Sequence, residues 1–239
     1  MSVTPTRRER LRAASFDEIH TIARDLLVRD GVEGITLRAI GRQMGMVPSA
    51  LYRYYPSLEE LQHGLCVVFY EECRDHLLRV VSAIPADPAT PRLFVACRAF
   101  RAWSTAHPAE FAMMFARPVG RHALPGRHPK LHAAAMGLTG VLVELFAEMW
   151  QQVNPPAGEA ELPPELRAHL QTFLAEFNVP LPVGTLYAAI AAWSRLYGLI
   201  ALELFGHMEV WMPDGEQMFE CELAAIARQF GVDLTRERP

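Results

Sequence analysis

The chain has 239 residues, of which 51% are hydrophobic and 21% are charged, and its formal net charge is −4. This composition excludes an intrinsically disordered chain, and the length suits a small domain joined to a larger one. No apolar run reaches the roughly 20 residues of a membrane-spanning helix, and the polar, arginine-rich start has no apolar signal core. The four cysteines form no CxxC motif and no pairing pattern. The sequence therefore predicts a cytoplasmic protein.

The charge is distributed unevenly along the chain. Residues 1–55 hold nine arginines and six acidic residues, a balance of +3, so the remainder carries −7. A basic head on an acidic body is typical of a small DNA-reading domain joined to a larger regulatory one. A chance fluctuation of a few charges gives the same split, so this observation supports the interpretation without deciding it.

The first expected helix begins near residue 15. Ser15 and Glu18 form a capping-box pattern at its start, and Gly31 supplies a stop at its end. Its apolar residues follow the three- and four-residue spacing of an amphipathic helix: Phe16, Ile19, Ile22, Ala23, Leu26 and Leu27.

Two short helices are expected next. The first runs from Thr36 to Met44, is capped by Thr36 and ends at Gly45. The second runs from Pro48 to Tyr55, with proline at a first-turn position where its missing N–H costs nothing.

A long helix is expected from Ser57 to about Ile84, opened by a second capping-box pattern of Ser57 and Glu60. The later helices are expected at about 90–106, 108–117, 130–153, 164–177, 183–206 and 215–230, with a loop at 154–164. No strand alternation or internal repeat is convincing. The sequence predicts an all-α fold, with a three-helix N-terminal domain at 1–57 and a larger helical domain at 58–239.

The first three helices have the layout of a helix-turn-helix. Gly45 permits a sharp turn between the second and third helices, because glycine adopts backbone conformations that other residues resist. Leu51 and Tyr55 can pack inward from the third helix. Its remaining side chains can face a DNA groove, where guanidinium groups pair with guanine edges or phosphates and phenol hydroxyls bond phosphate oxygens: Ser49, Tyr52, Arg53 and Tyr54.

One stretch of sequence resembles a known family. The spacing Ile19–Ala23–Leu27–Gly31–Thr36–Ile40–Gly45, followed by ALYRYYPSLEEL at 50–61, closely resembles the DNA-binding domain of TetR-family repressors. The resemblance implies that Tyr52 contacts DNA and that Arg53 and Tyr54 face its backbone or bases. It also implies that Arg38 reaches a base or phosphate, and that Thr36 caps its helix against a phosphate. The candidate DNA-binding residues are Thr36, Arg38, Pro48, Ser49, Ala50, Tyr52, Arg53 and Tyr54.

The chain departs from the family pattern at two positions. Val47 stands where the family often has serine, so the usual side-chain cap of the third helix is missing, and Leu58 stands where it usually has lysine. The loss of that lysine removes one phosphate contact. Either Arg53 or an arginine-rich arm can compensate, and a solvated, frayed terminus is the alternative interpretation of the arm: Arg7, Arg8, Arg10 and Arg12.

The segment WSRLYGLIALELFGH, residues 193–207, resembles a late helix of a TetR subgroup that has a Trp and a His-Gly pair. Tyr197 stands here in place of that His. In the family the last two long helices form a four-helix dimer interface, so the expected interface residues are Trp193, Tyr197, Gly198 and Ala201. The alternative is that these same residues pack inside one subunit.

The middle of the chain is rich in methionine and aromatic residues, which line adaptable apolar pockets but more often fill ordinary cores. The candidate ligand-binding residues are Trp103, Phe111, Met114 and Trp150.

His128 and His132 are four residues apart, with His122 before them, but no acidic or cysteine partner has a fixed spacing to them. We therefore predict no metal site and no cofactor. A loop that binds anions through the neighbouring arginines is a second weak reading: Arg117, Arg121 and Arg127. GxSxG, GxxxxGK[ST], GxGxxG and HExxH are all missing, and nothing indicates an enzyme.

The sequence and the resemblance together predict a homodimeric transcriptional regulator that binds a double-stranded DNA operator. The expected mechanism is repression, released when a small molecule shifts the dimer to a state that no longer matches successive major grooves. The long helix after Ser57 is the expected lever. The alternative is a helical ligand-binding or protein-interaction module with weakened DNA binding. The reason to consider it is that Leu58 stands where the family usually has lysine.

Overall fold

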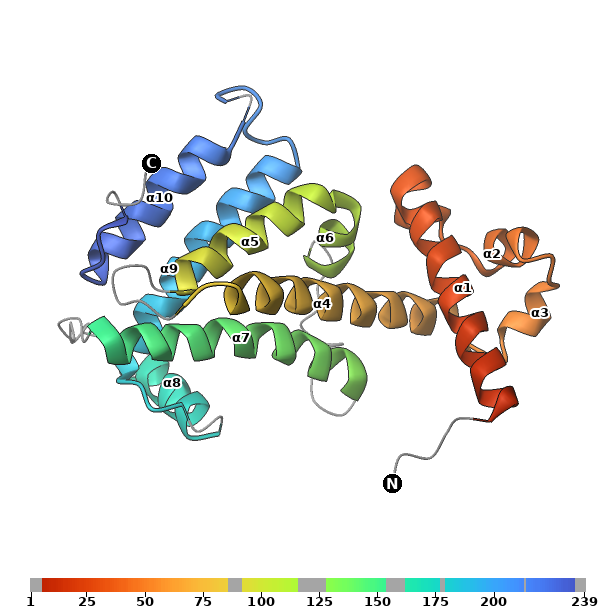
Figure 1. The fold of residues 1–239 in the computed structure, drawn as a ribbon, viewed down its shortest axis with the longest axis horizontal. Coiled ribbons are helices and arrows are strands. Elements are labelled where there is room, and N and C mark those ends of the chain that lie inside the picture. Colours follow the sequence, from red (N-terminus) through yellow and green to blue (C-terminus); the bar gives the residue numbers. More distant parts are fainter. Residues whose placement is uncertain are drawn as a thin grey trace. The chain divides into compact units, whose positions relative to one another are not determined.

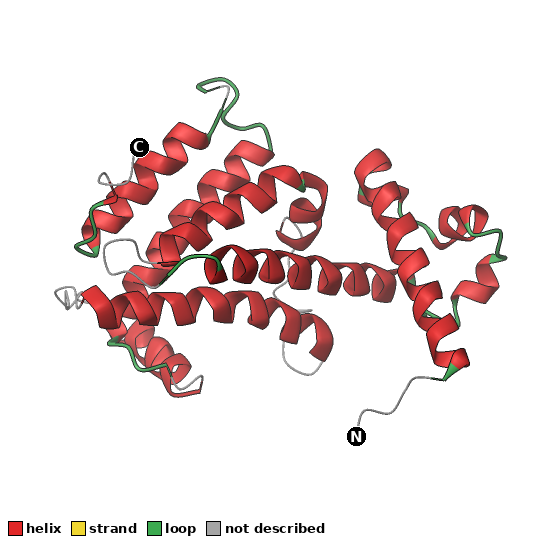
Figure 2. Ribbon diagram, viewed as in Figure 1, coloured by secondary structure: helices red, strands yellow, loops and turns green. Residues whose placement is uncertain are grey.

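The structure is a computed structural model, and it describes residues 6–85, 92–115, 128–153, 162–176, 179–212 and 214–234. Throughout these ranges the regular elements are helices, and no strand occurs in them (Figure 2). The prediction of an all-α fold is confirmed.

Five helical elements come first in the chain (Figure 1). They are α1 (Arg7–Asp30), the 3-10 helix η1 (Val32–Gly34), α2 (Leu37–Gln43), α3 (Pro48–Leu51) and α4 (Leu58–Ser82). The third helix is shorter than predicted, because Tyr52, Arg53 and Tyr54 form a turn after it.

Six further helices follow: α5 (Arg92–Ala106), α6 (Pro108–Phe115), α7 (Pro129–Val153), α8 (Pro164–Glu176), α9 (Val183–Leu204) and α10 (Glu216–Gln229). All six agree with the predicted segments to within a few residues. The predicted loop at 154–164 lies almost wholly outside the described residues.

The start of α1 differs from the prediction. Thr6, not Ser15, is the N-cap: its hydroxyl accepts from the Glu9 N–H at 3.3 Å, and the Glu9 carboxylate accepts from the Thr6 N–H at 2.7 Å. The Ser15 hydroxyl instead donates to the Leu11 carbonyl inside the helix. The capping box at Ser15 and Glu18 was therefore wrong, because an equivalent box nine residues earlier extends the helix through the predicted arginine-rich arm.

The helices group into two compact units. Among the described residues, one unit contains 6–73, 107–115 and 128–138, and the other contains 74–85, 92–106, 139–153, 162–176, 179–212 and 214–234, so α4 and α7 each contribute to both. This grouping follows spatial packing alone, and the functional boundary at 57/58 stays a prediction.

The first unit is built around the apolar face of α1. Ile19, Ala23 and Leu27 of this face are almost completely buried. Helix α1 packs against α2 and α6. Buried side chains of α2, α3, α4 and α6 complete the core of this unit: Ile40, Leu51, Leu61, Leu65, Phe69 and Phe111.

The second unit centres on α9, which packs against α5, α8 and α10. Phe100 of α5 lies against Trp193 of α9, with ring centroids 5.0 Å apart. Around this apolar contact, two arginines of α5 make charged contacts to later helices: Arg98 to Glu220 of α10 at 2.8 Å, and Arg101 to Glu203 of α9 at 2.7 Å.

Two helices, α7 and α9, are long and apolar enough to cross a membrane by length and composition, each with a mean hydropathy of 1.3 over its most apolar window. Core helices of water-soluble proteins pass the same test. Both helices here carry buried core residues, including Leu145 and Ile200.

Arg24 of α1 joins three helices of the first unit. Its Nε donates to the Glu110 carboxylate of α6 at 3.0 Å, and its other nitrogens donate to Glu72 of α4. Its guanidinium also lies over the Phe69 ring, 4.8 Å from the centroid. Burial opposes the charge on Arg24, but the two carboxylates outweigh it and raise its pKa. Glu110 is only 4% exposed, and Arg24 is its charged partner.

We expect Arg24→Ala to lower the free energy of unfolding by about 2–4 kcal/mol, because it leaves the Glu110 carboxylate buried without its arginine. Urea denaturation at neutral pH measures this change. Arg29→Ala is the matched control, since Arg29 pairs with Asp30 on the exposed surface of the same helix and its loss should change the free energy of unfolding little. Equal losses in the two variants would contradict the assigned role of Arg24.

Candidate nucleic-acid interface

Two glycines shape the turn between α2 and α3. Gly45 has a φ of +66°, in the left-handed region that favours glycine, as the sequence predicted. Gly41 was not predicted. A Cβ at this position would lie 2.8 Å from the Met46 carbonyl oxygen, and the Gly41 carbonyl accepts from the Met46 N–H, also at 2.8 Å. The bare backbone of Gly41 therefore lets the chain fold back against α2 before α3 begins.

Helix α3 begins without a side-chain cap. Val47 occupies the N-cap position with an extended backbone, makes no capping hydrogen bond and is 66% exposed, while Pro48 fills the first turn. The predicted loss of the cap is confirmed. A helix of four residues with no cap has little stability of its own, so its position depends on neighbouring elements.

Tyr55 anchors the turn that follows α3. Its ring packs edge-on against Phe16 of α1, its hydroxyl forms a hydrogen bond with Nε2 of His20, and it lies so close to α4 that a Cβ on Gly64 would meet its hydroxyl at 2.7 Å. Burial lowers the pKa of His20, which favours the neutral imidazole, and raises the pKa of Tyr55 to about 12. The predicted inward packing of Leu51, which is 1% exposed, and of Tyr55 is confirmed.

Most of the predicted DNA-binding side chains are on one exposed segment. The exposed ones are Thr36, Arg38, Pro48, Ser49, Tyr52 and Arg53. Ala50 and Tyr54 are half-buried, and the Tyr54 ring packs edge-on against Phe16 with centroids 5.3 Å apart. Tyr54 therefore also helps to hold the turn against α1.

The Thr36 hydroxyl caps α2 by accepting from the Ala39 N–H at 3.0 Å. This bond satisfies one free N–H at the helix start and leaves the threonine at the surface. The cap was expected from the sequence, and its role toward a phosphate stays a prediction.

The charge of this segment has one sign. From Gly34 to Leu58 the sequence contains three arginines, Arg38, Arg42 and Arg53, and no acidic residue. All three arginines are exposed, and Arg42 was not among the predicted contacts. Counting the charged residues around the helix-turn-helix, where no acidic residue occurs, would have identified Arg42 as well. A surface with this charge attracts phosphate backbones, and guanidinium groups bond phosphates or guanine edges well.

Family models match both parts of the chain. Residues 19–64 match "Bacterial regulatory proteins, tetR family", and residues 93–226 match "Tetracyclin repressor-like, C-terminal domain". The second match alone spans more than half of the sequence. The chain belongs to the TetR family of bacterial transcriptional regulators. It is a DNA-binding regulator, and the predicted family is confirmed.

Individual relatives agree with this assignment. The chain is 30% identical over 200 residues to the HTH-type transcriptional regulator Rv1816 of Mycobacterium tuberculosis, which covers 83% of this chain and 82% of that protein. The crystal structure of the regulatory protein SCO4313 superposes with a TM-score of 0.66 at 30% identity, covering 93% of this chain and 98% of that one. RolR in complex with resorcinol shares the fold, with a TM-score of 0.51 at 18% identity and 96% of each chain covered.

The candidate ligand residues do not lie in one unit of this family member. Trp103 on α5 and Trp150 on α7 belong to the second unit, and Phe111 and Met114 on α6 belong to the first. Trp103, Phe111 and Met114 are at most 4% exposed, and Trp150 is half-buried. Phe111 stacks against Phe115, and the Met114 carbonyl accepts from the Tyr70 hydroxyl at 3.3 Å.

The candidate dimer residues are all half-buried on α9. Trp193 packs inside its own unit against Phe100, whereas a Cβ added to Gly198 would meet no atom within 4 Å. The exposed large apolar residues of α9 and of its C-cap are Tyr187, Ile190, Leu202 and Phe205, none of which is among the four predicted interface residues.

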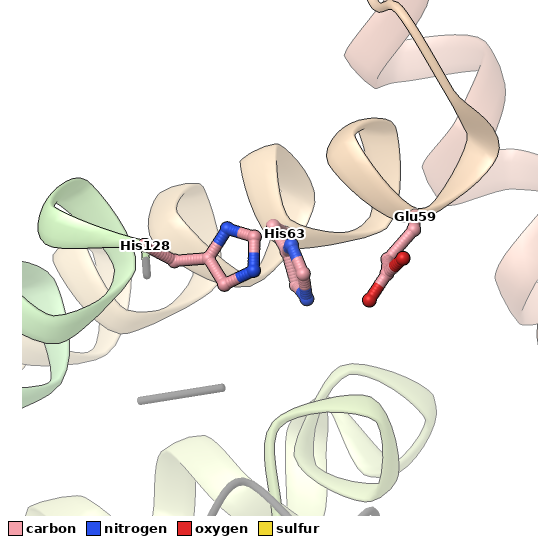
Figure 3. Close-up of side chains that lie close together, drawn as sticks. All are labelled: Glu59, His63 and His128. Carbon is pink, nitrogen blue, oxygen red and sulfur yellow. The ribbon is translucent and has the colours of Figure 1, made fainter. Parts of the chain in front are cut away.

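A histidine cluster that sequence reasoning missed lies elsewhere in the first unit. The His128 ring, just before α7, packs at a tilt against the His63 ring of α4 with centroids 3.9 Å apart, and Glu59 of α4 is close to both (Figure 3). No sequence spacing could reveal this, because His128 lies 65 positions after His63. His132 is half-buried on α7. His122, Arg117, Arg121 and Arg127 lie outside the described residues.

We expect stability to fall on acidification partly through His20. Its folded pKa lies below the unfolded value of 6.5, so its contribution is complete above pH 6.5 and is lost as the pH falls through the folded pKa. His20→Asn should therefore show a smaller loss of unfolding free energy than the native protein between pH 7 and pH 5, measured by urea denaturation. The exposed His169→Asn is the control. An unchanged pH dependence in His20→Asn would contradict this account.

Proposed function

We propose that this TetR-family protein is a homodimeric, cytoplasmic repressor that reads its operator through α2, α3 and the turn after α3, and that a small molecule releases it. The observation that carries the proposal is the acid-free segment 34–58, with exposed arginines on a helix-turn-helix frame.

The contacts divide by chemistry. Ser49 and Tyr52 offer hydroxyls from α3 and its turn, and Arg53 offers a guanidinium, so these three residues suit a major groove. Arg38 and Arg42 of α2 suit the flanking phosphates. The backbone N–H groups in the first turn of α2, which Thr36 caps, suit them as well. Leu58 begins α4 without the lysine usual in the family, so these arginines supply most of the positive charge.

The dimer interface that we propose is the outward face of α9 and α10. Its large apolar residues are 40–45% exposed. Exposure of this much apolar surface to water is unfavourable unless a second copy covers it. Gly198 lies on α9 with open space beside it, which allows close helix approach. The face comprises Tyr187, Ile190, Gly198, Ala201, Leu202, Phe205 and Met218.

Control by a small molecule completes the proposal. RolR, a distant fold neighbour, was solved with resorcinol. This chain carries aromatic residues and a methionine as candidates for contacts to an apolar ligand: Trp103 and Trp150 in the second unit, and Phe111 and Met114 in the first. Helix α4 begins one residue after Ser57 and continues to Ser82. A shift of α4 is therefore passed directly to the helix-turn-helix that precedes it. The ligand acts through its different affinities for the two states of that helix.

We expect Arg53→Ala to weaken binding to a duplex selected from a randomised library by roughly 10-fold or more, and to reduce the slope of log affinity against log salt by about one. Fluorescence anisotropy measures both quantities. Arg29→Ala removes an exposed arginine outside the segment and should leave both unchanged. Selection of no duplex at all would favour the alternative, a ligand-binding or interaction module with weakened DNA binding.

We expect Ile190→Glu to convert the dimer into a monomer at micromolar concentration, because it buries a charge in an apolar interface. Sedimentation equilibrium measures the mass. Leu166→Glu on α8 is the matched control, because Leu166 is another exposed aliphatic residue but lies outside the proposed face. This variant should remain dimeric. A dimer that survives Ile190→Glu together with Leu202→Glu would place the interface elsewhere.

A further inference from the structure

Three side chains with metal-binding groups meet in the first unit. Glu59 and His63 come from α4 and His128 from the residue before α7, and one ligand atom of each lies within 4.8 Å of the others. Figure 3 shows the three side chains pointing into a common space, with a ring nitrogen of His128 turned toward His63. These residues play no part in the proposed DNA or dimer surfaces.

The fold holds these groups together for simple reasons. Glu59 and His63 are four residues apart, so they share one face of α4, while Leu61 and Leu65 bury the opposite face of that helix. His128 is fixed at the start of α7, where its carbonyl accepts from the His132 N–H at 3.0 Å. Both imidazoles are 16% exposed, so their positions are set by packing.

Glu60 adds a second carboxylate beside the cluster. Its Oε1 lies 3.4 Å from Nδ1 of His128 and 4.0 Å from Nδ1 of His63. A carboxylate at Nδ1 favours the tautomer that carries its proton there, which leaves Nε2 to bind a metal. Carboxylates in this position orient ligating histidines in many metal sites.

We propose that Glu59, His63 and His128 bind a divalent transition metal of the zinc class, with Glu60 as the group that orients His128. Two imidazoles and a carboxylate are the donor set that Zn²⁺, Co²⁺ and Ni²⁺ accept. Three protein ligands leave a further position for water or for an oxygen or nitrogen of a bound molecule.

The required movement is small. Ligand atoms at about 2.1 Å from a tetrahedral ion lie about 3.4 Å from each other. The three atoms here lie within 4.8 Å of one another, so side-chain adjustments of about 1.4 Å or less would bring them to that distance.

Ion pairing without a metal is the competing explanation, since Glu60 can pair with a protonated His128. That pairing involves only one of the two imidazoles, whereas a metal ion would account for the approach of both rings, whose centroids lie 3.9 Å apart, and of Glu59. A metal stabilises both imidazoles in their neutral form. The bound ion would tie the first turns of α4, which directly follow the reading head, to the start of α7. This inference goes beyond the proposed function and does not depend on it.

The test is titration of the tag-free full chain, freed of metal by chelation, with Co²⁺ and with Zn²⁺ at pH 7.5. We expect one Co²⁺ per chain with the visible absorption of a low-coordinate site, and Zn²⁺ should displace it. His63→Gln combined with His128→Gln should lower affinity by at least about 100-fold, Glu59→Gln should lower it less, and Glu60→Gln should lower it roughly 10-fold.

The control pairs His169→Gln with His207→Gln, which removes two exposed histidines outside the cluster and should bind as the native chain does. Thermal unfolding without metal checks that each variant is folded, and the exposed Glu59→Gln serves if the histidine variants are not. Unchanged Co²⁺ affinity in folded variants of the cluster, or no saturable binding by the native chain, would overturn the proposal. Either result leaves duplex binding, measured separately, as the test of the proposed function.

Discussion

The buried charge of Glu110 constrains the whole N-terminal unit. A carboxylate this deep in the protein needs a cation, and Arg24 reaches it only when α1, α4 and α6 are all in place. The guanidinium then lies between two carboxylates and the Phe69 ring, so small displacements of one helix change several contacts together. Helix α1 packs against α2 of the helix-turn-helix, and α4 follows α3 directly in the chain. The ion-pair network therefore couples the positions of these three helices to one another.

The recognition segment depends on this frame because it has almost no structure of its own. Helix α3 comprises only four residues and lacks a side-chain cap. Leu51 and Tyr55 hold it from within, and the close approach of Gly41 to Met46 sets where it begins. The residues that face solvent are thus separated from those that carry the fold. Tyr54 is the exception, since its ring also packs against Phe16.

Local patterns explain which parts of the fold could be predicted. Apolar spacing and glycine and proline positions predicted the helices, and the Val47 departure correctly predicted an uncapped α3. The start of α1 was wrong because two capping boxes compete and the earlier one, at Thr6, is satisfied. Contacts between distant segments could not be predicted: the Arg24–Glu110 pair and the His63–His128 contact join residues whose separation carries no periodic signal. The dimer interface on α9 stays a prediction, because Trp193 fits both a dimer seam and the contact with Phe100.

The shortness of α3 has a consequence for how this protein can change over evolutionary time. Because Ser49, Tyr52 and Arg53 are exposed and the anchoring contacts are made by their buried neighbours, replacement of these three residues leaves the core untouched. On the proposed function, sequence preference can therefore change at these positions while the buried contacts stay the same. A gene duplicate could thus acquire a new set of target sites through few substitutions while it kept the same helices and the same response machinery.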